Sequence, residues 1–199
     1  MLAAVLAACT TPAPAESPSA TTPLPPASST SVPSPGAGLT VVPVNQTFEH
    51  SSGQLTVLVK SYATGLDLNA YTPYLPGTDA MLVAVEIEVD VADGSDVKLN
   101  FWPILAGNGA DPELDGWDKK TPVNITELGG DGPLAAAGLP VYAPVGSGEG
   151  SGWLVYIVRE NQLADFKTPY HLWFIQPKSK SSSAVEYPAK TFDMTLVAG

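Results

Sequence analysis

The sequence predicts an all-β fold, a β-sandwich, because short runs of alternating apolar and polar residues are separated by turn residues. The run LVAVEIEVDV at residues 82–91 places Val and Ile side chains on one face and mostly acidic side chains on the other. Clusters of Gly, Pro, Asn and Asp stand between such runs, and no long amphipathic helical pattern is visible. About seven short strands separated by turns are typical of a sandwich.

The same pattern identifies the individual elements. The runs expected to be strands are residues 54–62, 82–91, 152–160, 170–177 and 190–199. Residues 152–160 (GWLVYIVRE) are apolar on both faces, which favours a central strand. Helical turns are expected only near residues 134–137 and 160–166.

The start of the chain predicts a membrane anchor rather than part of a fold. LAAC at residues 6–9 places the single cysteine after small residues and a short apolar run. It resembles the lipobox of bacterial lipoproteins, which implies that Cys9 carries a diacylglyceryl group and becomes the mature N-terminus. Residues 1–8 are then a signal-peptide remnant whose true start lies upstream, since no basic residue precedes Cys9. The alternative is an incidental cysteine in a frayed terminus.

The lipidated cysteine and the residues after it, 9–38, are expected to form a disordered linker. Residues 10–38 contain eight Pro, six Ser and five Thr, and Glu16 is their only charged residue. Such a composition offers little apolar surface to bury, so the segment should stay extended as a stalk. The predicted location is therefore the extracytoplasmic face of a bacterial cell membrane, with lipid as the anchor.

Residues 39–199 have the length of one domain with its own core. The formal net charge of the chain is −11, and nearly all of it falls in this part. An acidic surface argues against nucleic acid as a partner and suits a soluble monomer. Because the part contains no cysteine, the apolar core and not a disulfide must supply its stability.

Several segments resemble a family of immunoglobulin-like domains of unknown function found in Gram-positive and actinobacterial surface lipoproteins. They are residues 80–116 (AMLVAVEIEVDVADGSDVKLNFWPILAGNGADPELDG), the glycine-rich segment GSGEGSGWLVYIVRE at 146–160, and the closing FDMTL. The resemblance implies an immunoglobulin-like sandwich, similar to that of a secreted immunogenic mycobacterial antigen, with a glycine-rich turn before the strand at 152–160. It implies no enzymatic activity.

Catalytic chemistry is not predicted, and the chain is expected not to be an enzyme and to need no cofactor. Serine hydrolysis needs a histidine base, and the chain contains only His50 and His171. The glycines of GSGEGSG do not stand in a strand-to-helix frame, and His171 is expected to be structural or on the surface.

One acidic segment imitates a calcium loop. Asp111, Glu113 and Asp115 precede Gly116 at the spacing of the first ligands of an EF-hand loop. The residue at the last position of such a loop would be Pro122 instead of a bidentate Glu. A plain acidic turn is therefore preferred to a metal site.

Two groups of residues are candidates for binding a partner. The first consists of aromatic side chains in or beside turns, namely Tyr71, Tyr74, Trp102 and Trp117. The second is the acidic strand face formed by Glu86, Glu88 and Asp90. The competing interpretations are that Trp102 and Trp117 cap the core and that the acids only solubilise the strand.

These observations favour a non-catalytic binding or accessory module held out from the membrane to meet a protein or glycan of the envelope. The alternative is a solute- or ion-binding lipoprotein that serves a membrane transporter or sensor. A concave site would distinguish them, since solute capture needs a pocket of roughly 300–1,000 Å³.

Overall fold

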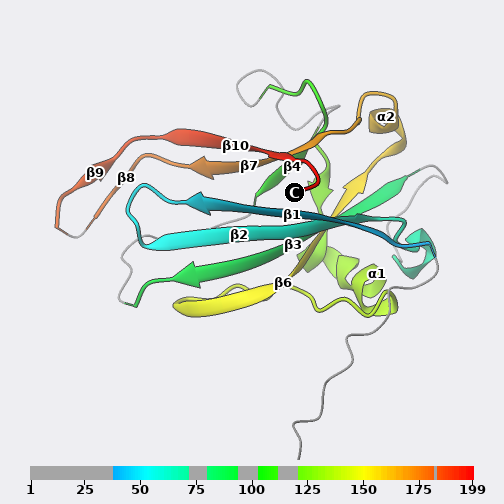
Figure 1. Cartoon of the computed structure of the whole chain (residues 1–199), viewed down its shortest axis with the longest axis horizontal. Coiled ribbons are helices and arrows are strands. Elements are labelled where there is room, and N and C mark those ends of the chain that lie inside the picture. The colour runs from blue at the N-terminus through cyan, green and yellow to red at the C-terminus, as the bar shows by residue number, and fades with distance from the viewer. Residues whose placement is uncertain (1–37, 72–79, 94–102, 112–120, 182) are drawn as a thin grey trace, which may run out of the picture. The chain divides into compact units, whose positions relative to one another are not determined.

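The computed structural model describes residues 38–71, 80–93, 103–111, 121–181 and 183–199, and these form mainly antiparallel β-strands (Figure 1). The all-β class predicted from the sequence is thereby confirmed. The larger sheet has the strand order β1 (Thr40–Glu49), β2 (Leu55–Thr64), β3 (Met81–Val91), β6 (Gly148–Val158) and β5 (Val123–Asn124). The smaller sheet has the order β10 (Lys190–Leu196), β7 (Tyr170–Gln176) and β4 (Ile104–Ala106), and β8 (Ser179–Lys180) pairs with β9 (Glu186–Tyr187).

The helices are short. They are η1 (Leu68–Ala70), the π-helical turn η2 (Thr126–Gly130), α1 (Asp131–Ala136) and α2 (Glu160–Leu163). Both helical turns expected from the sequence are confirmed by α1 and α2. In the part of the chain that the structure describes, no helix has the length and apolar character needed to cross a membrane.

The two sheets share one hydrophobic core. Val83, Val85 and Ile87 of β3 are fully buried in it, together with Leu172 and Phe174 of β7. These residues alternate along their strands, so one face of each sheet points into the shared core. The smaller sheet accordingly lies over the larger one (Figure 1).

The larger sheet also buries part of its outer face. Leu82 and Ala84 of β3 and Val155 of β6 are buried there with Leu134 of α1. β6 is therefore covered on both faces from Trp153 onward, as expected of a central strand. This second cluster lies at the end of the sheet where α1 packs (Figure 1).

The glycine-rich segment is part of a strand and not the expected turn. β6 begins at Gly148 and pairs with β3 along its whole length. A β-carbon at Gly150 would lie 2.7 Å from a methyl group of Val145, and one at Gly152 would lie 2.5 Å from the backbone nitrogen of Tyr142. The glycines are needed because the preceding segment of the chain packs directly against this half of β6.

Candidate docking face on the larger sheet

Along β3, the outer face of the larger sheet changes from apolar and buried to acidic and exposed. Leu82 and Ala84 are buried in the second cluster, whereas Glu88 and Asp90 are exposed. Glu86 lies at the boundary with 26% of its side chain exposed. The sequence prediction that Glu86, Glu88 and Asp90 share the face opposite the shared core agrees with this burial pattern.

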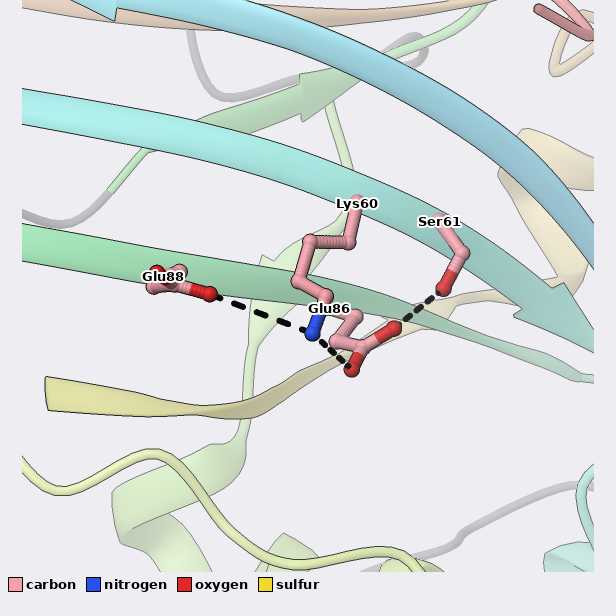
Figure 2. Close-up of polar contacts among 4 residues, drawn as sticks. All are labelled: Lys60, Ser61, Glu86 and Glu88. Atoms are coloured by element: carbon pink, nitrogen blue, oxygen red, sulfur yellow. Dashed lines mark hydrogen bonds and ion pairs between the residues drawn. The ribbon is translucent and has the colours of Figure 1, made fainter.

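Lys60 and Ser61 of β2 both bind Glu86. The Nζ atom of Lys60 lies 3.5 Å from Glu86 Oε1 and 3.9 Å from Glu88 Oε2. The hydroxyl of Ser61 donates a 2.6 Å hydrogen bond to Glu86 Oε2. Figure 2 shows the two side chains reaching the same carboxylate from β2. Glu86 is therefore a partnered residue of the sheet, and it is less available to a binding partner than its neighbours.

A β-bulge explains how two consecutive residues reach one carboxylate. The pairing of β2 with β3 shifts between Val59 and Ser61, so that Lys60 is the extra residue opposite Glu86. Before the bulge Val57 and Val59 face the shared core, and after it Ala63 faces the second cluster. Leu55, Val57 and Val59 alternate with Thr56, Leu58 and Lys60 as the sequence predicted, and the bulge exchanges the two faces only after Lys60.

The register of the strands brings three further acids into one row. Glu49 of β1 is opposite Thr56 of β2, Thr56 is opposite Asp90 of β3, and Asp90 is opposite Glu149 of β6. The three carboxylates are exposed. Among the described residues, no Lys, Arg or His lies within ion-pair distance of any of the three. We call the exposed surface formed by Glu49, Glu86, Glu88, Asp90 and Glu149 the acidic face.

Two acids of this row, Asp90 and Glu149, repel each other. Asp90 and Glu149 are directly opposite each other on neighbouring antiparallel strands, where β-carbons are about 5 Å apart and like charges destabilise the sheet. Lys60, at the far end of the acidic face, contacts only Glu86 and Glu88 of these acids. The face therefore presents net negative charge that the described part of the chain leaves uncompensated.

Sequence reasoning missed Glu49 and Glu149 as members of this face, and Lys60 as the ion-pair partner of Glu86 and Glu88. Glu149 could have been found by extending the alternation of β6 backwards through Gly148, where the glycines suggested a turn instead. Glu49 could not be assigned from alternation, because it lies in a strand that the pattern did not reveal. Lys60 falls on the polar side of residues 54–62 by alternation, but its contact with Glu86 depends on the bulge and on the pairing of β2 with β3.

The predicted aromatic and calcium-loop residues are not brought together by the described structure. Tyr71 is only 5% exposed and packs in the second cluster, so it is not the exposed aromatic that the sequence suggested. Asp111 is half-buried just after the segment that follows β4. The other predicted residues lie outside the described residues, and they are Cys9, Tyr74, Trp102, Glu113, Asp115 and Trp117.

The two histidines lie in different structural settings. His50 is 5% exposed in the turn after β1, and its Nδ1 accepts a hydrogen bond from the backbone N–H of Ser52. Burial lowers its pKa, which favours the neutral ring. His171 Nδ1 lies 2.8 Å from Asp193 Oδ1 across β7 and β10. Within the described ranges, no group of three or more His, Cys, Asp and Glu side chains is arranged to hold a metal ion.

Comparison with known proteins adds no assignment, because no family model, curated protein or solved structure matches this chain.

Proposed function

We propose that the chain is a lipid-anchored lipoprotein of the bacterial envelope whose immunoglobulin-like β-sandwich is a non-catalytic module that docks a basic protein. The immunoglobulin-like assignment is supported by two antiparallel sheets that share one core. The docking role is supported above all by the row Glu49, Asp90 and Glu149.

The physical argument concerns charge compensation. Opposed carboxylates on a sheet reduce stability unless a cation approaches them. Acids scattered over the surface would serve solubility equally well, whereas the strand register gathers exposed acids on one half of one sheet face. A partner with Lys or Arg on a matching surface would relieve the repulsion and would be attracted from a distance.

The docking role is tested by crosslinking in intact cells. A photoreactive residue at Ser151, which lies on the exposed side of β6 opposite Glu88, should capture a protein partner. The same residue placed at Ser183, an exposed position on the connection between β8 and β9, is the control. Capture at Ser183 alone, or equal capture of the same proteins at both positions, would contradict docking through the acidic face.

A charge variant then measures the contribution of the row. Glu49→Gln with Asp90→Asn and Glu149→Gln should slow association with the purified partner about tenfold at low salt, because charge mainly accelerates encounter. The matched control removes three charges elsewhere, at Glu127, Glu160 and Asp165, all exposed. If the two triple variants bind equally, net charge and not the acidic face accounts for association.

The anchoring part of the proposal rests on Cys9 and has its own test. In cells that express the protein with a complete leader, Cys9→Ala should move it from the membrane fraction to the medium. Unchanged partitioning would refute lipid attachment and would leave the docking face unaffected.

A further inference from the structure

A hollow of about 480 Å³ opens on the opposite half of the larger sheet from the acidic face, beside η2. Its walls are formed by Tyr71, Val123, Ile125, Leu128, Ile157 and Arg159. The volume lies in the range of small-molecule sites, which is roughly 300–1,000 Å³. The alternative function considered from the sequence, solute capture, would require a concavity of this size.

The walls combine an apolar surface with one cation. Tyr71, Ile125 and Ile157 are at most 6% exposed and form the floor of apolar atoms. Arg159 follows directly after β6, and in the described part of the chain no carboxylate lies within ion-pair distance of its guanidinium. A guanidinium is always charged and binds carboxylates through two parallel hydrogen bonds.

Backbone hydrogen bonds of η2 hold Leu128 at the apolar rim of the hollow. Leu128 is 60% exposed, although it is a large aliphatic residue. Its backbone N–H and that of Gly130 both donate to the carbonyl of Ile125, at 3.0 and 2.9 Å. Gly130 admits no side chain, since a β-carbon there would overlap the Ile125 carbonyl.

Thr126 fixes this turn to the sheet. Its hydroxyl accepts a buried 2.9 Å hydrogen bond from the backbone N–H of Val155 in β6. It also donates to Asn124 Oδ1 at 2.7 Å. The hydroxyl of Thr126 therefore connects the turn to both β6 and β5. These hydrogen bonds fix the backbone that carries Leu128 beside the hollow.

The other wall is fixed at the junction of β6 with α2. The backbone N–H of Arg159 donates to Gln162 Oε1 at 2.8 Å, and the buried Gln162 donates through Nε2 to the Thr121 carbonyl at 3.2 Å. The backbone of Arg159 is thus held while its long side chain stays exposed. An apolar floor, together with a cation that has no ion-pair partner among the described residues and stands on a fixed backbone, can recognise an amphiphilic anion.

From this geometry we infer that the hollow binds a small organic acid, with the carboxylate on Arg159 and the apolar body between Leu128 and the buried floor. The site goes beyond the proposed docking role, because its residues lie on the half of the sheet that the helices cover. Loss of either site by substitution should leave the other unchanged.

The test uses decanoate as the probe and the full chain as the protein. Backbone amide resonances of residues 123–128 and 157–159 should shift and saturate with decanoate, whereas resonances of the acidic face should not move. Decanol, which has the same chain without the charge, should bind about tenfold more weakly, because a charge-assisted hydrogen bond is lost.

Three variants complete the experiment, and each changes an exposed side chain, so the fold is expected to persist. Arg159→Gln should weaken decanoate about tenfold and leave decanol unchanged, and Leu128→Ser should weaken both. Lys178→Gln removes a cation outside the hollow and should change neither. Absence of a saturable shift overturns the site, and equal binding of decanoate to wild type and Arg159→Gln overturns recognition of the anion. An unchanged melting temperature shows that the variants are folded.

Discussion

Gly152 offers the sharpest test of why the sequence GSGEGSGW is rich in glycine. Its φ angle is +151°, and a β-carbon there would lie 2.5 Å from the nitrogen and 2.6 Å from the Cα of Tyr142. Both atoms belong to the backbone, so no rotamer change can relieve the overlap. Gly152→Ala must therefore displace the segment that contains Tyr142.

The cost follows from what holds that segment. The N–H of Tyr142 donates to the Trp153 carbonyl at 3.0 Å, and the N–H of Trp153 donates to the Pro140 carbonyl at 2.8 Å. Each hydrogen bond contributes about 0.5–1.5 kcal/mol. Displacement would also expose part of Tyr142, which is 6% exposed in the shared core. We expect Gly152→Ala to lower the free energy of unfolding by about 2–4 kcal/mol.

Urea unfolding followed by tryptophan fluorescence measures this difference. Gly146→Ala is the matched control, because a β-carbon at Gly146 meets no atom within 4 Å. It should change stability by no more than about 0.5 kcal/mol, or raise it slightly through the unfolded chain. A loss below about 1 kcal/mol for Gly152→Ala, or an equal loss in both variants, would refute the close approach of the two segments.

Two further predictions concern buried polar groups. Tyr156 donates a buried 2.7 Å hydrogen bond to the Pro103 carbonyl, so Tyr156→Phe should cost about 1–3 kcal/mol in urea unfolding. Tyr62→Phe, whose hydroxyl bonds to none of the described residues, should cost little, and equal losses would contradict the role of the bond. Because burial lowers the pKa of His50, the unfolded chain binds the proton more readily, so the contribution of His50 to the free energy of unfolding should be lost as the pH falls below about 6.5. The urea midpoint between pH 7.5 and 5.5 should therefore depend less on pH in His50→Gln than in the wild type, and the same slope in both proteins would refute this.

Alternation along the chain predicted the central strands well. β3 and β7 bury every second residue in the shared core, and their aliphatic and aromatic side chains make this period visible. β1 was not recognised, because Pro43 and the bulge before Gln46 interrupt its pattern. Asn45 has a φ angle of +53° in that bulge, which is a conformation that strand propensity does not anticipate.

The candidate docking face likewise has a part that alternation predicts and a part that only strand pairing determines. The outward position of Glu88 and Asp90 is a property of β3 alone, since neighbouring side chains in any strand point to opposite faces. The alignment of Glu49 with Asp90 and Glu149 needed the pairing of four strands, and two bulges alter that pairing.

The sequence by itself determined the all-β class, the main strands and the charge of one strand face. Only the tertiary structure decided which acids share a row, that Lys60 and Ser61 bind Glu86, and that Arg159 stands beside an apolar hollow. The physical reason is that side-chain alternation is a local property of two or three consecutive residues. Strand order, register and the closure of a hollow depend instead on hydrogen bonds and contacts between segments far apart in the chain.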